Sequence, residues 1–198
     1  MMPGVGSLLL TDDFSAPEVW NVAASNQASV SVNENRLTIA VQPGIAPVVS
    51  FRKGEVFGDM YAEITAQPSL CQGADDYGFA YRAPNNIAYY RFALACNGTA
   101  GAERISLSSA RVLQAPLASA DVPAGAPGQV RLGVWAAGQD FHFFLNGRYQ
   151  FSAADKSYPA GGIGVFAHAA GTSPVTVTFS DLKVYSVTYE PPVTPAAP

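Results

Sequence analysis

Apolar and polar residues alternate with a period of two along most of this chain, and that alternation limits the folds available to it. Successive side chains of a strand point to opposite faces of a sheet, whereas a helix needs an apolar repeat near 3.6 residues, which no segment sustains. Turn-forming residues recur every eight to twelve positions, a spacing typical of β-sandwiches and barrels. We therefore predict an all-β fold.

The same pattern locates the expected strands. The turn-like Asn33-Glu34-Asn35 predicts a hairpin over 28–41. Further strands are expected at 48–51, 56–66, 77–82, 87–96, 103–109, 111–118, 129–135, 140–145, 148–153, 162–168 and 175–189. A chain of 198 residues is long enough to bury a substantial core in one domain.

We place that domain at residues 8–189. Residues 1–7 are interpreted as a disordered or cloning-derived N-terminus, because MMPGVGSLLL lacks the basic region and apolar length of a signal peptide. A leader has then been removed, or the chain is a fragment. Residues 190–198 are rich in proline and predict a linker to a neighbouring domain, with a simple terminal tail as the alternative.

Composition excludes two classes of partner. The net charge is −4 and basic residues are scattered, so no basic stripe is available for a nucleic-acid backbone. No apolar run approaches the roughly 18 residues that a membrane-spanning helix requires, so we expect no membrane insertion.

Register predicts two hairpins that each have one apolar and one mixed face. A four-residue loop at 83–86 pairs Phe79 with Tyr90, and a loop at 136–139 pairs Val134 with Phe141. The opposite faces carry aromatic and basic side chains where a solvated sheet would carry threonine, lysine, glutamate and serine. Those residues are Arg82, Tyr89, Arg91, Trp135, His142 and Phe144.

The first register also places Cys96 opposite Gly73, within reach of Cys71. We predict a disulfide between the two cysteines, which favours an oxidising compartment and hence an extracellular or cell-surface protein. The alternative is a pair of buried free thiols in a cytosolic protein.

The mixed faces predict a saccharide-binding platform formed by Arg82, Tyr89, Arg91, Trp135, His142 and Phe144. Sugar rings stack on aromatic side chains, while arginine and histidine donate hydrogen bonds to hydroxyl groups. Two alternatives stay open. The face is covered and forms a second small core, or it is a protein–protein surface of a structural or adhesion module.

Ordered motifs over residues 8–188 resemble the concanavalin A-like lectin/glucanase superfamily, in particular laminin-G-like jelly-roll modules of bacterial exported proteins. They are Leu10-Thr11-Asp12-Asp13-Phe14-Ser15 with Trp20, Tyr77-Gly78-Phe79-Ala80-Tyr81-Arg82, Asn86-Ile87-Ala88-Tyr89-Tyr90-Arg91-Phe92, Phe144-Leu145-Asn146-Gly147, Gly162-Ile163-Gly164-Val165-Phe166-Ala167 and Val177-Thr178-Phe179-Ser180-Asp181-Leu182-Lys183-Val184. The resemblance implies a two-sheet antiparallel jelly-roll sandwich, with a concave outer face on one sheet.

Glucanases of that superfamily carry the signature Glu-x-Asp-x-(x)-Glu, and none of the six glutamates here has such a partner. We therefore predict a non-catalytic module, with a domain similar to the bacterial 3-keto-glycoside hydrolases as the enzyme alternative. The adjacent Asp75 and Asp76 are interpreted as a solvated turn, and the two histidines do not predict a zinc site.

The resemblance also bears on calcium, because many carbohydrate-binding sandwiches hold a structural calcium where the first and last strands meet. Asp12, Asp13 and Asp181 lie on those segments, and their oxygens suit a hard cation. The alternative is that Asp13 and Asp181 simply cap turns.

Overall fold

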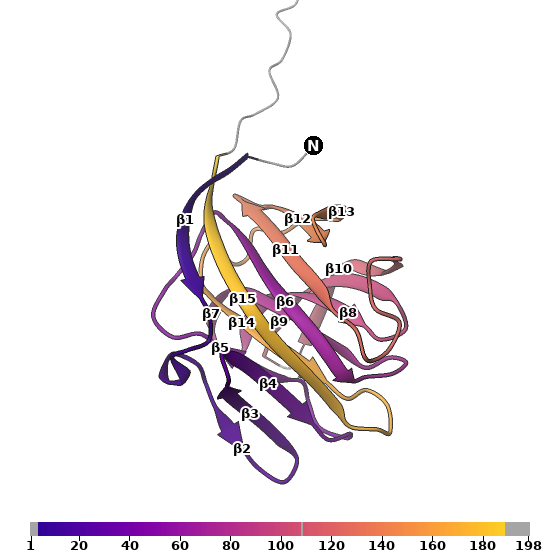
Figure 1. The fold of residues 1–198 in the computed structure, drawn as a ribbon. Helices are drawn as coiled ribbons and strands as arrows, with labels where there is room; N and C mark the ends of the chain where they lie inside the picture. Colours follow the sequence, from indigo (N-terminus) through magenta and orange to yellow (C-terminus); the bar gives the residue numbers. More distant parts are fainter. Residues whose placement is uncertain (1–3, 108, 189–198) are drawn as a thin grey trace, which may run out of the picture.

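The computed structural model describes residues 4–107 and 109–188, almost all of them in strands or the turns between strands (Figure 1). The first strands are β1 (Gly4–Asp12), β2 (Ala23–Ala24), β3 (Ala28–Asn33), β4 (Arg36–Val41), β5 (Val48–Phe51), β6 (Met60–Leu70), β7 (Asp76–Asn85) and β8 (Ala88–Ala95). They are followed by β9 (Thr99–Ser106), β10 (Ser109–Ala118), β11 (Val130–Ala137), β12 (Asp140–Leu145), β13 (Arg148–Ala154), β14 (Gly162–His168) and β15 (Val175–Thr188). One short 3-10 helix, η1, covers Pro17–Val19. The described residues contain no helix long and apolar enough to cross a membrane.

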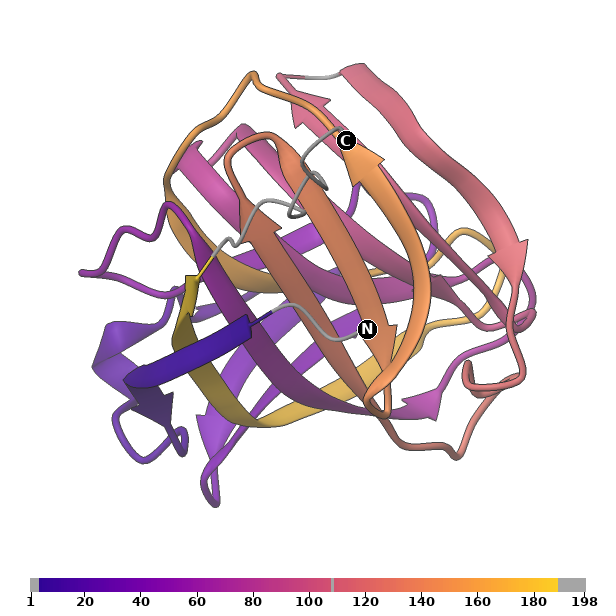
Figure 2. The same ribbon diagram turned by 90° about the horizontal axis from the view of Figure 1, so that it is seen from above.

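The strands form two antiparallel sheets. The nine-stranded sheet has the order β13-β12-β11-β6-β15-β4-β3-β2, with β1 added beside β15. The six-stranded sheet has the order β10-β9-β8-β7-β14-β5. The sheets stack as two layers, as Figure 2 shows from above. The predicted all-β, two-sheet jelly-roll sandwich is confirmed.

Aromatic rings from the two predicted hairpins meet between the sheets. Tyr90 of β8 lies 4.8 Å from Phe141 of β12, and Phe92 lies 4.9 Å from Phe143, measured between ring centroids. All four side chains are fully buried. The apolar faces of the hairpins thus form the middle of the core, and their other faces must point outward.

Both hairpins are shifted by two residues from the predicted register. Phe79 pairs with Phe92 and Val134 pairs with Phe143, where Tyr90 and Phe141 were expected. In the second hairpin Gly138 has a φ of 54°, which permits a tighter turn than the predicted four-residue loop. Since a shift of two preserves which residues share a face, the predicted inner and outer faces hold except at Arg82, whose side chain is buried.

The N-terminal boundary lies earlier than predicted. Strand β1 begins at Gly4 and pairs with β15 from Gly4–Thr188 to Asp12–Leu182. Residues 4–7 are therefore part of the nine-stranded sheet and not a separate disordered segment. The predicted proline-rich tail at 190–198 lies outside the described residues.

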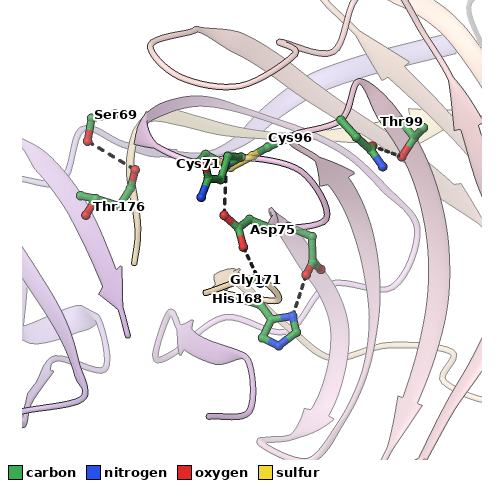
Figure 3. Close-up of a disulfide and its surroundings, with 11 residues drawn as sticks. Ser69, Cys71, Asp75, Cys96, Thr99, His168, Gly171 and Thr176 are labelled. Carbon is green, nitrogen blue, oxygen red and sulfur yellow. Dashed lines mark hydrogen bonds and ion pairs between the residues drawn. A yellow bond between two sulfur atoms is a disulfide. The ribbon is translucent and has the colours of Figure 1, made fainter. Parts of the chain in front are cut away.

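Cys71 and Cys96 form a disulfide, as predicted (Figure 3). It joins the end of β6 to the turn after β8. The adjacent Asp75 is buried, and its carboxylate accepts backbone hydrogen bonds from Gln72 and Gly171, each at 3.0 Å. Asp75 is therefore an internal loop anchor, which corrects its interpretation as part of a solvated turn.

Removing this disulfide should destabilise the fold. The bond joins residues 25 positions apart, and closing a loop of that length restricts the unfolded chain by about 3.5 kcal/mol in the chain-entropy model. We expect the double variant Cys71→Ser/Cys96→Ser to lose a comparable free energy of unfolding, measured by urea denaturation. Two titratable thiols in denatured, unreduced wild-type protein would contradict the bond itself.

Asp155 ties the end of the nine-stranded sheet to the six-stranded sheet. Its carboxylate accepts hydrogen bonds from the Tyr90 hydroxyl at 2.7 Å and from the Ser157 amide at 2.8 Å, and it pairs with Arg104 at 2.9 Å. Burial alone would raise the pKa of Asp155, but the hydrogen bonds from Ser157 and Tyr90 and the charge of Arg104 outweigh it and lower the pKa to about 2.

This lowered pKa predicts acid sensitivity. The folded protein releases the Asp155 proton more readily than the unfolded chain, so the resulting stability is present above about pH 4 and is lost as the pH falls towards about 2. We expect Asp155→Asn to unfold more easily at pH 5 and to show a shallower loss of stability between pH 4 and 2. Urea denaturation across this range measures both effects, with Glu34→Gln in an exposed turn as the control.

Candidate binding site

The structure divides the predicted aromatic and basic face between two sides of the molecule. Trp135, His142 and Phe144 lie on the outer face of the nine-stranded sheet, on β11 and β12. Tyr89 and Arg91 lie on the outer face of the six-stranded sheet, on β8. The two hairpins pack against each other through their apolar inner faces, so their outer faces lie on opposite sides of the sandwich. These two groups therefore cannot form one platform.

Arg82 lies on neither outer face. A bulge in β7 gives Arg82 a φ of 46°, and the side chain turns into the interior. Its guanidinium donates hydrogen bonds to the carbonyls of Gly58 at 3.0 Å and Gly138 at 2.6 Å, and to the Asp59 carboxylate at 3.1 Å. It also stacks on Phe141 at 5.3 Å. The prediction that Arg82 lines an exposed platform is therefore wrong, and Arg82 connects loops.

Because Arg82 is buried, replacing it should lower the stability of the fold and leave the outer surfaces of the sheets unchanged. We expect Arg82→Met to lower the free energy of unfolding by about 3 kcal/mol, because three hydrogen bonds from a buried charged donor are lost, each contributing about 1 kcal/mol. Chemical denaturation measures the loss. An unchanged midpoint would show that the guanidinium contributes nothing to holding the Gly58 and Gly138 loops.

The outer face of the nine-stranded sheet is largely closed around Trp135. This side chain is 2% exposed and belongs to a small cluster with Tyr61 and Phe144. The ring of His142 lies 5.0 Å from that of Trp135, and burial lowers the pKa of His142. Within the described residues, this face matches the alternative of a second small core, since a buried indole offers no platform for a sugar ring.

The outer face of the six-stranded sheet is different, because a charged network occupies its centre. Arg91 pairs with Glu103 of β9, with 2.6 Å between Nε and Oε2, and with Asp76 of β7 at 3.6 Å. Its guanidinium lies 5.1 Å over the ring of Phe166. Asp76 in turn accepts a hydrogen bond from His168 Nδ1 at 2.8 Å. Four strands thus hold this network in place.

A hollow of about 360 Å³ lies beside the network, and we call it the polar hollow. Its floor consists of small residues, Ala93, Ala95 and Gly101, while β10 forms one wall. A Cβ at Gly101 would lie 3.0 Å from the carbonyl oxygen of Gln114, so β10 approaches this closely because a glycine is there. The lining residues are Ala74, Asp76, Arg91, Ala93, Ala95, Asn97, Thr99, Gly101, Ala102, Glu103, Gln114, Pro116, His168 and Ala170.

A second hollow, of about 450 Å³, adjoins the first, and we call it the apolar hollow. Tyr89 is among its lining residues but is only 6% exposed, and its ring meets Phe51 edge-on at 5.5 Å. Val49, Ile105 and other apolar residues surround it. Arg91 lines both hollows, so the two are neighbours on one face of the sheet.

Asp76, Glu103 and His168 complete the network around Arg91 and are not among the site residues predicted from the sequence. Asp76 was assigned to a solvated turn with Asp75, but it is the first residue of β7 and its side chain points to the outer face. In Figure 3, Asp75 lies between the disulfide and His168. The alternation along β7 could have predicted the position of Asp76, because Asp76, Gly78 and Ala80 are alternate residues and therefore lie on the same outer face.

Comparison with solved structures identifies the fold. The carbohydrate-binding module CBM66 from Bacillus subtilis matches with a TM-score of 0.69 and 14% identity, over 85% of this chain and 96% of that chain. A Bacillus subtilis protein of unknown function with a galectin-like fold matches at 0.67 and 14%, over 96% and 100%. The catalytic domain of an endo-1,3-β-glucanase (laminarinase) from Thermotoga petrophila matches at 0.64 and 11%, over 94% and 100%.

The fold is that of the concanavalin A-like jelly rolls. At these identities the likeness concerns the fold alone, since such sandwiches serve binding modules and hydrolases alike. No protein-family model and no curated protein sequence matches the chain.

The calcium site suggested for jelly rolls does not fit the residues present. Asp12 accepts hydrogen bonds from the Phe14 amide at 2.7 Å and the Trp20 indole at 3.1 Å, and it pairs with Arg52 at 2.6 Å. A guanidinium against the carboxylate leaves no place there for a cation. Asp13 and Asp181 accept local hydrogen bonds from serines, which matches the turn-capping alternative. In residues 4–107 and 109–188, no three histidine, cysteine, aspartate or glutamate side chains are grouped to hold a metal ion.

Proposed function

We propose that this jelly roll is a non-catalytic extracellular module that binds a saccharide in the polar hollow. One observation carries the proposal: hydrogen-bonding groups of both kinds surround a floor of alanine and glycine. Asp76 and Glu103 accept hydrogen bonds, while Arg91 donates them. Sugar hydroxyls both donate and accept, so such a mixture suits them, and the small floor residues leave room for a ring.

The fold supports the same proposal from a second direction. A carbohydrate-binding module and a laminarinase catalytic domain share this sandwich. The disulfide between Cys71 and Cys96 is consistent with an oxidising, extracellular location.

The carboxylates of the polar hollow favour binding over hydrolysis. Glycosidases need two carboxyl groups placed across the scissile bond, one of them free to give a proton. Asp76 and Glu103 instead lie against the same guanidinium of Arg91, and Glu103 contacts it through two nitrogens. Neither carboxyl group stands free as the proton donor.

Replacing Arg91 should weaken saccharide binding. We expect Arg91→Met to reduce affinity for the glycan retained best on an array of neutral and acidic glycans by about tenfold to a hundredfold, the effect of losing a charged hydrogen bond. Isothermal titration calorimetry measures the change. The matched control is Arg131→Met, which removes an exposed arginine from the outer face of the other sheet.

A second variant separates ligand contact from loss of the ion pairs. Ala95→Leu fills the polar hollow while Arg91, Asp76 and Glu103 stay in place, and it should weaken binding as well. Unchanged affinity in both variants would locate binding elsewhere, and retention of no glycan at all would contradict the function. Release of reducing ends from the bound glycan would overturn the non-catalytic assignment.

A further inference from the structure

The contacts of Arg91 bear on which sugars the polar hollow can take. Arginine commonly binds the carboxylate of an acidic ligand through two parallel N–H groups, which form a fork that matches the two carboxylate oxygens. An arginine in a saccharide site would by itself suggest a uronic acid as the ligand. The geometry of Arg91 favours the opposite class of sugar.

Each nitrogen of the Arg91 guanidinium already faces a carboxylate of the protein. Nε and Nη2 lie 2.6 and 2.5 Å from Oε2 of Glu103, and Nη1 lies 3.6 Å from the Asp76 carboxylate. The fork formed by Nε and Nη2 is thus taken by Glu103, and the fork formed by Nη1 and Nη2 has Asp76 beside it. A guanidinium has five N–H groups, so single hydrogen bonds to sugar hydroxyl oxygens stay possible.

The charge of the lining is also unfavourable for an anion. The polar hollow is lined by two carboxylates, Asp76 and Glu103, and by one guanidinium, which leaves a formal charge of −1 with His168 neutral. Among the described residues that line it, no other side chain carries a charge. An anionic ligand would lose part of its hydration and meet an excess of negative charge at short range, and both effects cost free energy.

His168 contributes an acceptor to the hollow. Its Nδ1 donates a hydrogen bond to Asp76 at 2.8 Å, so the other nitrogen of the neutral ring carries a lone pair. A lone pair accepts a hydrogen bond from a sugar hydroxyl and repels a carboxylate oxygen. The other polar side chains of the lining, Asn97, Thr99 and Gln114, are uncharged and suit hydroxyl groups in the same way.

We propose that the polar hollow takes non-acidic saccharides and excludes uronic acids and other anionic sugars. This inference rests on the proposed saccharide binding and adds the chemical class of the sugar. Glu103 and Asp76 are the specificity-determining residues, because they occupy the arginine that would otherwise bind a ligand carboxylate.

Sugars that differ only at C6 test the proposal. The probes are the methyl glycosides of glucose, galactose and mannose and of their three uronic acids, titrated by calorimetry or by NMR chemical-shift changes at pH 8. We expect the neutral member of the bound pair to bind at least about tenfold more tightly, which corresponds to about 1.4 kcal/mol. A uronic acid that binds as tightly as its neutral counterpart, or more tightly, overturns the inference.

Two charge-removing variants test the cause of the exclusion. Glu103→Gln keeps an acceptor beside Arg91 but removes one negative charge, so the ratio of neutral to acidic affinity should fall to about threefold or less. Asp76→Asn makes the same change on β7 and should lower the ratio in the same direction. The matched control is Glu63→Gln, since Glu63 pairs with Arg131 on the outer face of the other sheet. It should preserve the full ratio.

The outcomes separate this inference from the proposed function. A ratio that neither Glu103→Gln nor Asp76→Asn lowers assigns the exclusion to shape and overturns the inference, while saccharide binding stands. Failure of every neutral and acidic sugar to bind the wild-type protein overturns saccharide binding and this inference with it. Urea denaturation establishes that each variant is folded, and if one variant is not, the other decides.

Discussion

The contact between the aromatic inner faces of β7–β8 and β11–β12 determines the rest of the molecule. Tyr90 and Phe92 meet Phe141 and Phe143 with ring centroids 4.8 and 4.9 Å apart. Burial of these rings stabilises the packing of one sheet on the other. It also turns the two remaining faces in opposite directions. The outer face of the nine-stranded sheet holds the closed cluster around Trp135, and the outer face of the six-stranded sheet holds the two hollows.

Alternation predicted the faces but not their assembly. The two-residue shift in each hairpin left every inner residue inside, because side-chain direction repeats every two positions. Which sheet each hairpin joins depends on pairings between distant segments, such as β11 with β6 and β7 with β14, and no local pattern encodes them. Hairpin register alone therefore could not show that Tyr89 and Trp135 belong to different sheets.

Arg82 and Asp76 show two other limits of sequence reasoning. Arg82 leaves its expected face because its own positive φ interrupts the regular strand. Arginine rarely adopts a positive φ, so the sequence does not predict this conformation. The pair Asp75-Asp76 predicts a solvated turn. In the structure the two carboxylates point to opposite sides, one anchoring loops and the other joining the network of Arg91 and His168. Strand β7 begins at Asp76, one residue before the predicted start at Tyr77, so Asp76 lies in the strand and Asp75 in the loop before it.

The charge balance around Arg91 connects the fold to ligand choice. Two carboxylates already compensate its guanidinium, so an acidic sugar would meet Asp76 and Glu103 as well as the arginine. Neutral hydroxyl groups face no such repulsion. Because strands β7, β8, β9 and β14 each contribute one member, the donors and acceptors are fixed before a ligand arrives, and less conformational entropy is lost on binding.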